Sequence, residues 1–302
     1  MSILNVEHLS NSFGDRVIFD DVSFRLLKGE HIGLIGANGE GKSTFMKIVT
    51  GQLIPEEGKV EWAKHVITGY MDQTAILTKG STIRMVLQTA FDELFEMESR
   101  MNQLYMDMAY ESISETQMDE MMSEAGSLAD VLNAHDFYMI DAKIDEVSRA
   151  LGLYDLGLDR DVVDLSGGQR TKVLLAKLLL QKPDILLLDE PTNYLDVEHI
   201  TWLQKYLQEY ENAFILISHD IPFLNSVVNI IYHMDNSALT RYVGDYDKFM
   251  EVYEVRKAQK EAAYNRQQKE IAELKDFVAR NKARVSTRNM AMSRQRNWIR
   301  WR

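Results

Sequence analysis

The sequence predicts an α/β protein built on a sheet with parallel strands, and three features of the chain lead to this prediction. The segment Gly36-Ala37-Asn38-Gly39-Glu40-Gly41-Lys42-Ser43 fits the pattern G-x-x-x-x-G-K-[ST], which describes a phosphate-binding loop. An apolar, strand-like run, His31–Ile35, precedes this loop, and a helix-compatible run, Thr44–Val49, follows it. Short apolar runs at Ile185–Leu188 and Ala213–Ile217 alternate with helical stretches, as in parallel sheets covered on both faces.

The first part of the chain favours short β-strands separated by turns. Residues 3–70 contain strand-like runs at Val17–Phe19, Val22–Phe24 and Lys59–Trp62. Residues 81 to about 150 instead have the apolar spacing of helices. A further helix-compatible run extends from Leu165 to Leu180.

Within the helical region, residues 92–146 have an unusual composition. They contain 15 acidic residues, opposed only by Arg100 and Lys143, and 8 of the 16 methionines of the chain. Several of these methionines recur near helical spacing, which more often indicates helix packing than a ligand site: Met97, Met101, Met108 and Met122. We therefore expect an acidic helical insertion that projects as an arm.

Charge is divided unevenly along the chain, whose net charge is −12. Residues 256–302 contain 14 Lys and Arg against 4 Asp and Glu, a net charge of +10, so residues 1–255 carry −22. No Gly or Pro follows Asp245, and Ile271, Leu274 and Val278 keep helical spacing, which predicts a long basic helix with a narrow apolar face. Such a segment suits a polyanion, either nucleic acid or an anionic membrane surface, and a solvated charged helix is the alternative.

The composition is that of a globular protein of 302 residues, of which 45% are hydrophobic. No apolar stretch is long enough to span a bilayer, and the N-terminus lacks the basic start and apolar core of a signal peptide. The chain has no cysteine, which excludes disulfides and thiolate chemistry. We expect a cytoplasmic protein with no transmembrane segment of its own.

The phosphate-binding loop and one strand end supply the groups needed to hydrolyse a nucleotide. Backbone N–H groups of the loop and the positive end of the following helix would face the phosphates. Lys42 would reach the β- and γ-phosphates, and the Ser43 hydroxyl would bind Mg²⁺. Asp189 and Glu190 end an apolar strand, where Asp189 is suited to the Mg²⁺ shell and Glu190 to activation of the attacking water.

Further motifs in the expected order make the chain similar to the ATP-binding cassette (ABC) proteins. Leu165-Ser166-Gly167-Gly168-Gln169 resembles their signature motif and lies upstream of the acidic pair. Gln73 resembles the Q-loop glutamine, Asp196 the D-loop aspartate and His219 the switch histidine. Phe13 fits the aromatic residue that stacks on adenine. The resemblance covers residues 3–243.

The ABC resemblance implies a nucleotide-binding domain with a mixed sheet, an antiparallel β subdomain and a helical subdomain that carries the signature motif. It also implies an ATPase in which two cassettes pair head to tail, so that each ATP lies between the P-loop of one and the signature of the other. The implied catalytic residues are Glu190, His219 and Gln73, and the implied Mg²⁺ ligands are Ser43, Gln73 and Asp189. The implied nucleotide-binding residues are Phe13, Gly36, Asn38, Gly39, Gly41, Lys42, Ser43, Thr44, Ser166, Gly167, Gly168 and Asp196.

Within the ABC proteins, the chain resembles the ABC-F family of twin-cassette proteins that act on ribosomes. Asn193-Tyr194 stands where transporter cassettes usually have small residues, and Arg241–Tyr246 resembles the exit from a first ABC-F cassette. The basic helix resembles the linker between the two cassettes, with Lys282–Arg284 and Ser293–Gln295 similar to its tip and return. The resemblance implies an ATP-dependent translation factor whose linker reaches P-site tRNA and rRNA.

We therefore expect a cassette at residues 1–244, with the acidic insertion at 92–146, and a linker at 245–302. Its partners would be a second cassette, which is either a missing C-terminal half or another copy, and the ribosome. The ending, residues 296–302, does not resemble the usual ABC-F continuation, and a one-nucleotide slip in a sequence for Lys-Lys-Leu-Asp-Lys-Met can give Lys-Asn-Trp-Ile-Arg-Trp. We hypothesise a frameshifted or truncated product whose last residues are non-native.

Two other functions remain open at the level of sequence. One is the ATPase subunit of a membrane transporter, against which the residues after Asp245 and the Asn193-Tyr194 pair argue. The other is a half-protein that binds ATP without efficient turnover, because it has one P-loop and one signature. Within ABC-F proteins, a general translation role and protection from antibiotics are equally compatible with the motifs. The acidic insertion favours a basic ribosomal protein over RNA.

Overall fold

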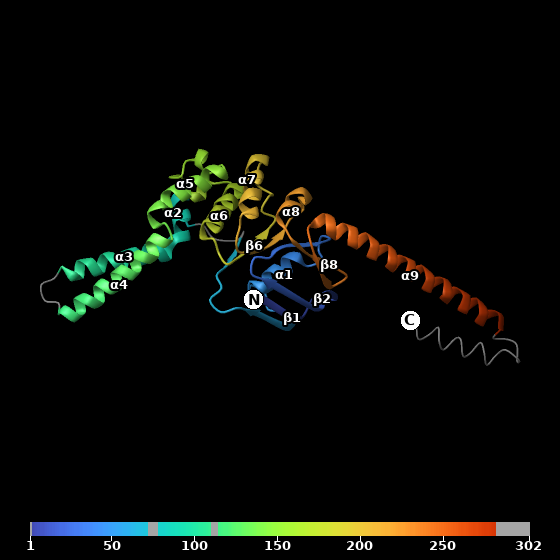
Figure 1. Cartoon of the computed structure of the whole chain (residues 1–302). Helices are drawn as coiled ribbons and strands as arrows, with labels where there is room; N and C mark the ends of the chain where they lie inside the picture. The colour runs from blue at the N-terminus through green and yellow to red at the C-terminus, as the bar shows by residue number, and fades with distance from the viewer. Residues whose placement is uncertain (1, 72–77, 110–113, 282–302) are drawn as a thin grey trace. The chain divides into compact units, whose positions relative to one another are not determined.

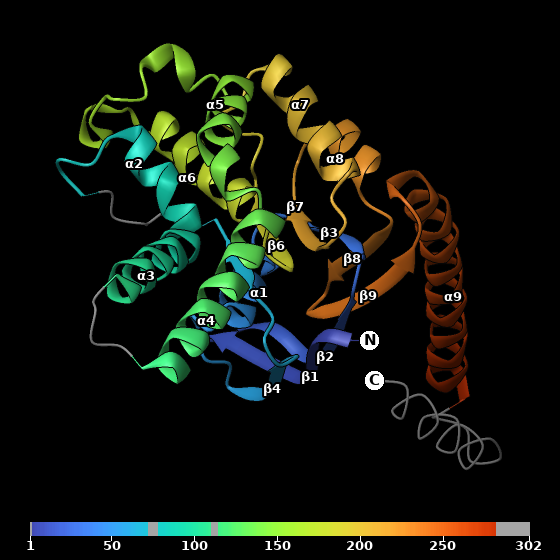
Figure 2. The ribbon, with the colours of Figure 1, turned by 60° about the vertical axis from the view of Figure 1, so that its left-hand side comes forward.

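The computed structural model describes residues 2–71, 78–109 and 114–281. The chain divides into two compact units, residues 1–246 and residues 247–302. The first unit contains two sheets and the short helix α1 (Lys42–Val49), with further helices around them (Figures 1 and 2). This arrangement agrees with the α/β class predicted from the sequence.

The larger sheet has six strands in the order β5-β6-β7-β3-β8-β9. Their bounds are β3 (His31–Gly36), β5 (Thr68–Tyr70), β6 (Ile185–Asp189), β7 (Ala213–Ile217), β8 (Ile230–Asp235) and β9 (Ala238–Val243). All neighbours are parallel except β8 and β9, so the sheet is mixed. Residues Ile185–Leu188 and all of β7 are buried, which explains why both strands read as uninterrupted apolar runs.

The second sheet is antiparallel and has the order β2-β1-β4. Its strands are β1 (Ser2–Phe13), β2 (Arg16–Leu27) and β4 (Glu57–Trp62). The two short strands expected at Val17–Phe19 and Val22–Phe24 are therefore one strand of 12 residues. The polar interruption between them is an irregularity within the strand, where Asp21 has a φ of 52°, and His8 on β1 has the same φ.

Helix α1 and both sheets share one core. Phe45 and three other apolar residues of α1 are buried together with strand residues from each sheet. The ring of Phe45 lies 5.0 Å from the ring of Phe24 on β2, and Phe24 lies 4.4 Å from Tyr232 on β8. This packing fixes α1, which begins at the phosphate-binding loop, between the two sheets.

The helical part of the first unit matches the expectation for residues 81–150 and beyond. Its α-helices are α2 (Ile83–Gln88), α3 (Asp92–Met108), α4 (Glu115–Ala134), α5 (Ile140–Ala150), α6 (Gly167–Gln181), α7 (Val197–Gln208) and α8 (Ile221–Val227). Short 3₁₀ helices connect several of them: η1 (Thr89–Phe91), η2 (Phe137–Met139), η3 (Tyr154–Leu156) and η4 (Val162–Asp164). Helices α2, α5 and α6 contact one another, and α7 contacts α8 (Figure 2).

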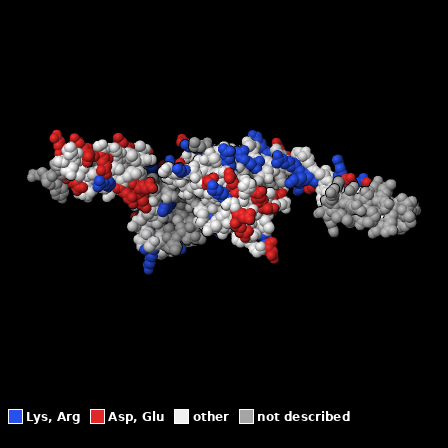
Figure 3. Space-filling view, turned by 90° about the horizontal axis from the view of Figure 1, so that it is seen from below, with Lys and Arg blue, Asp and Glu red and all other residues white. Residues whose placement is uncertain are grey.

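Helices α3 and α4 form the arm that the acidic composition indicated. They lie side by side, and Arg100 on α3 donates a hydrogen bond of 2.8 Å to Glu124 on α4. Met101 is buried together with Leu104 and Leu132, as expected for a methionine that serves helix packing. The expectation is wrong for Met122, which is 62% exposed. Asp and Glu side chains gather over the surface of this arm (Figure 3).

The described part of the second unit is the long helix α9 (Tyr246–Asn281), which confirms the predicted helix over these residues. The positive charge is not spread evenly over the segment. Residues 246–280 contain 8 Lys and Arg and 7 Asp and Glu, whereas residues 282–302 contain 7 Lys and Arg and no acidic residue. The linker-tip resemblance at Lys282–Arg284 and Ser293–Gln295 and the unusual ending lie outside the described residues. Across the described ranges, no helix is long and apolar enough to cross a membrane.

Candidate nucleotide-binding site

The predicted phosphate-binding loop joins the end of β3 to the start of α1. Gly41, the last residue before the helix, has a φ of 106°, which is strained for any residue with a side chain. A Cβ atom at this position would lie 2.4 Å from Cγ2 of Ile18 and 3.0 Å from the ring of Phe19. Glycine is required here because β2 passes directly beneath the loop. The first turn of α1 therefore presents its free N–H groups at the loop.

Lys42 extends across the loop that precedes it. Its ammonium Nζ donates hydrogen bonds of 2.8 Å to the Gly36 carbonyl and 3.1 Å to the Ala37 carbonyl. A lysine ammonium has three N–H donors, so these contacts hold the charge at the loop and leave a donor for an anion. Gly36 is closely packed, since a Cβ there would lie 2.8 Å from the Met234 carbonyl oxygen.

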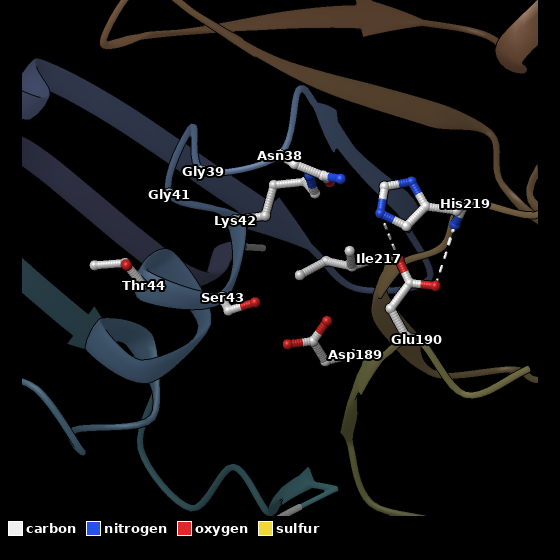
Figure 4. A pocket seen from close by; sticks show the side chains of 10 residues that line it. All are labelled: Asn38, Gly39, Gly41, Lys42, Ser43, Thr44, Asp189, Glu190, Ile217 and His219. Atoms are coloured by element: carbon white, nitrogen blue, oxygen red, sulfur yellow. Dashed lines mark hydrogen bonds and ion pairs between the residues drawn. The ribbon is translucent and has the colours of Figure 1, made fainter. Parts of the chain in front are cut away.

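Two carboxylates at the end of β6 face this loop. Asp189 is the last residue of β6 and pairs with Ile217, the last residue of β7. Glu190 follows in the left-handed conformation, with a φ of 50°, and its N–H donates to the Ile217 carbonyl at 2.9 Å. This backbone geometry turns the Glu190 side chain into the pocket beside Lys42 and Ser43 (Figure 4).

The environment of Glu190 changes its acidity. Its side chain is 16% exposed, and this burial raises the pKa of the Glu190 carboxyl above its usual value. The His219 backbone N–H, which donates to Oε2 at 3.2 Å, and the His219 ring act in the opposite direction on the pKa. The second oxygen, Oε1, is buried and accepts no hydrogen bond from the described residues, although His219 Nε2 lies 3.4 Å away. An unsatisfied carboxylate oxygen in this position is suited to accept a proton or a hydrogen bond from water.

One pocket brings many of the predicted residues together. It is lined by Asn38, Gly39, Gly41, Lys42, Ser43, Thr44, Asp189, Glu190, Ile217 and His219 (Figure 4). Only Ile217 was missed by the sequence analysis. Its signal was available, because Ile217 ends the apolar run next to the strand that carries the acidic pair.

The oxygen atoms of this pocket fit a magnesium ion bound together with phosphates. Ser43 and Asp189 both line it, and Mg²⁺ typically takes one or two carboxylates while the substrate phosphates and waters complete its coordination. The described residues contain no cluster of three or more acidic or histidine side chains that would hold a metal alone. Gln73, the third predicted ligand, lies outside the described residues.

The signature residues lie at the beginning of α6 and do not line this pocket. The Ser166 hydroxyl accepts a hydrogen bond of 3.3 Å from the Gln169 N–H, and the Gln169 side chain accepts one of 2.9 Å from the Ser166 N–H. This capping box starts the helix at Gly167, where an added Cβ would meet nothing within 4 Å. The positive end of α6 is therefore open on the side of Gly167 where a side chain would lie, and such helix ends attract anions.

The pocket lining also lacks three other predicted residues of the described chain: Gly36, Phe13 and Asp196. Phe13 ends β1 and is 54% exposed, beside a turn in which Gly14 has a φ of 61°. Asp196 precedes α7, and its carboxylate lies 3.5 Å from His199 Nδ1 and 4.0 Å from Lys172 Nζ. No local pattern pointed to Lys172 and His199, because helices α6 and α7 bring them together only in the folded chain.

The fold and pocket define a P-loop nucleotide-binding domain, and comparison with known proteins identifies the family. A family model described as "ABC transporter" matches residues 19–193, and a second one with the same description matches residues 232–299. The first match covers more than half of the chain. The chain therefore belongs to the ABC family of ATP-binding cassette proteins and is an ABC ATPase.

Curated relatives indicate where the chain belongs within the ABC family. It is 69% identical over 296 residues to the uncharacterized ABC transporter ATP-binding protein YfmM of Bacillus subtilis, covering 98% of this chain and 57% of YfmM. It is 34% identical to the energy-dependent translational throttle protein EttA of Haemophilus influenzae, covering 92% of this chain and 50% of EttA. It is 32% identical to ABC transporter F family member 5 of Arabidopsis thaliana, and the match covers 94% of this chain and 42% of that protein. These relatives confirm the ABC-F resemblance, and the chain spans about half of their length.

Solved structures confirm the cassette fold. The structure of an ATP-binding subunit of an ABC transporter superposes with a TM-score of 0.60 and 21% identity, covering 84% of this chain and 94% of that one. A nucleotide-free cassette from an ABC transporter gives a TM-score of 0.54 at 22% identity. At such identities the likeness shows the fold alone.

Proposed function

We propose that this chain supplies the first ATP-hydrolysing cassette and part of the linker of an ABC-F ATPase that acts on ribosomes. The observation that carries the proposal is the direct continuation of the cassette into α9 and then into a segment with 7 basic and no acidic residues. A segment of this charge gives strong, sequence-independent attraction to RNA phosphates. The similarity to EttA, which is named as a translational throttle, supports the same role.

The pocket geometry supports a hydrolytic role for Glu190. Lys42 and the N–H groups at the start of α1 would hold the β- and γ-phosphates of ATP. The Glu190 carboxylate would take a proton from the attacking water, whose oxygen bonds to the γ-phosphorus as the bond to ADP breaks. His219 would keep Glu190 in place through its backbone N–H and ring. Magnesium held by Ser43 and Asp189 would supply positive charge at the phosphates.

The composition of the pocket lining supports a requirement for a second cassette. The signature residues at the start of α6 are absent from this lining, and their N–H groups would instead contact the γ-phosphate of ATP held by the other cassette. ATP binding would then close the pair, and hydrolysis would release it.

The α3–α4 arm and residues 282–302 carry charges that suit different ribosomal surfaces. The basic residues of 282–302 favour rRNA and the tRNA near the exit and P sites, because their charge is opposite to that of phosphate. The α3–α4 arm is acidic (Figure 3), so a basic protein surface fits it better than RNA. Closure of the cassettes would change how these two parts engage the ribosome.

A ribosome co-sedimentation experiment tests this function. The chain carrying Glu190→Gln, which is expected to retain ATP, is sedimented with ribosomes at increasing salt concentrations. Replacement of Lys282, Arg284 and Arg288 by Gln is expected to weaken binding and to flatten its salt dependence. The log–log slope should change by about 0.7–0.9 for each phosphate that the variant no longer neutralises.

The matched control removes the same charge from the described helix, by replacing Lys257, Lys260 and Arg266 with Gln. The proposal predicts a smaller loss for this control, because acidic neighbours accompany these residues on α9. Equal effects of both sets, or no ATP-dependent binding to ribosomes, would contradict the proposal. Binding to anionic lipid vesicles instead of ribosomes would favour the transporter alternative.

A further inference from the structure

Arg16 lies beside the phosphate-binding loop but belongs to none of the motifs named above. It is the first residue of β2, and it is the register partner of Phe13, the last residue of β1. Partners that lie directly opposite each other on antiparallel strands project their side chains from the same face of the sheet. Arg16 therefore shares a face with the exposed aromatic ring that we predict stacks on the adenine.

The guanidinium of Arg16 contacts the phosphate-binding loop. Its Nη2 donates a hydrogen bond of 3.0 Å to the carbonyl of Gly39. A Cβ atom added at Gly39 would lie 3.5 Å from Nη1 and 3.6 Å from Nη2, so the guanidinium packs against the loop backbone. Arg16 therefore connects the strand end that carries Phe13 with the phosphate-binding loop.

Arg16 retains free hydrogen-bonding capacity at this position. A guanidinium has five N–H donors, and the contact with Gly39 uses one of them. Within the described residues, no carboxylate forms an ion pair with Arg16. An arginine held next to a phosphate-binding loop without an acidic partner is well suited to bind an anion.

The strand that carries Arg16 is anchored beside the loop. The Ser237 hydroxyl donates a hydrogen bond of 3.0 Å to the Val17 carbonyl, and the Asp20 N–H donates one of 3.0 Å to the Ser237 carbonyl. Ile18 and Phe19 pack against Gly41. The backbone at Arg16 is thereby fixed with respect to the loop, and the exposed guanidinium is held there by its hydrogen bond to Gly39.

We propose that Arg16 binds the phosphate chain of the nucleotide and links the adenine-stacking hairpin to the phosphate-binding loop. The inference rests on the proposed nucleotide site and adds a residue to it. Its anion ligand is the polyphosphate of a nucleoside di- or triphosphate. A nucleoside without phosphates would lack this contact.

Nucleotide titrations of the full chain test this role, with ATP, ADP and adenosine as the probes. Arg16→Ala is expected to weaken ATP and ADP binding about tenfold, the size of one charge-assisted hydrogen bond, and to leave adenosine binding unchanged. Arg16→Lys keeps the charge without the planar fork and should give an intermediate loss. The loss in Arg16→Ala should shrink as salt concentration rises.

Arg25→Ala is the matched control, because Arg25 lies on the same strand and its backbone is bonded to Tyr232 rather than to the loop. It should leave all three affinities unchanged. The inference would be overturned if Arg16→Ala lost equal affinity for ATP and adenosine, or lost no affinity for ATP. In either case, ATP binding by the wild-type chain would still support the nucleotide site itself. Absence of ATP binding by the wild-type chain would overturn both. Melting temperatures of the variants separate a binding effect from misfolding.

Discussion

Glu190 combines three local features that rarely occur together. Its backbone is left-handed, its carboxylate is largely buried, and one oxygen has no hydrogen-bond donor in the described part of the chain. Left-handed backbone conformations in residues other than glycine are unfavourable and persist where the surrounding structure imposes them. Here the hydrogen bond from the Glu190 N–H to Ile217 imposes the conformation and aims the side chain at the loop.

Replacement of Glu190 by Gln separates binding from hydrolysis. The amide is nearly isosteric but cannot accept a proton from water, so ATP turnover should fall by at least about 10²-fold, the contribution of a general base. ATP affinity should be retained, because Lys42 and the loop are unchanged. Steady-state phosphate release measures turnover, and nucleotide titration measures ATP affinity. Lys42→Ala serves as the contrasting variant, because it should weaken ATP binding itself. Unchanged turnover in Glu190→Gln would remove this residue from the proposed chemistry.

The raised pKa of Glu190 predicts the acid limb of the pH profile. A general base works only as the carboxylate, so activity falls as the pH drops through its pKa, and burial places that fall above the pH expected for an ordinary glutamate. Protonated His219 lowers the pKa of Glu190. His219→Ala should therefore move the acid limb of kcat to higher pH. His135→Ala is the control, because it changes an exposed histidine at the end of α4 and should leave the acid limb in place. A shift of the limb to lower pH in His219→Ala would contradict the proposed effect of His219 on Glu190.

At the level of elements, some strands and pocket residues could be predicted from the sequence, and others could not. Strands β6 and β7 could be recognised because both of their faces are buried, which leaves an uninterrupted apolar run. Strand β2 could not be read as one element, because the irregularity at Asp21 interrupts its apolar pattern. Pocket residues within the loop motif and at strand ends, including Ile217 at the end of β7, were available from local sequence. Arg16 was not, since only the tertiary packing of β2 against the loop places it there.

Helix α6 and the loop after Glu190 meet at Gly168. A Cβ there would lie 3.1 Å from Cδ1 of Tyr194, whose side chain is partly exposed and has room to move. Gly168→Ala should therefore fold, with a stability equal to or up to about 1 kcal/mol above wild type, because alanine favours the helix. ATPase activity should fall, since the signature face is altered. Thermal unfolding measures the stability, and an ATPase assay measures the turnover. Gly126→Ala on α4 is the control, because an added Cβ there meets no atom within 4 Å, and it should leave turnover unchanged.

At the scale of the whole molecule, the pocket and the signature helix occupy different places on one chain. If each site needs both, turnover of this chain requires two copies or another cassette. The rate per chain should then rise with protein concentration at saturating ATP until the pairs are fully formed. An ATPase assay over a wide concentration range measures this dependence. A rate per chain that stays constant down to the lowest concentration, with a monomeric mass in ATP, would contradict pairing.

The left-handed backbone at Glu190 has a consequence for how the protein can change in evolution. Any glutamate codon becomes a glycine codon by one base substitution, and glycine adopts this conformation without steric strain. The same substitution removes a desolvated carboxylate, so Glu190→Gly should yield a chain that folds at least as well and no longer turns over ATP. Selection for stability and selection for turnover therefore oppose each other at this codon. Mutational libraries screened only for abundance should enrich inactive variants there.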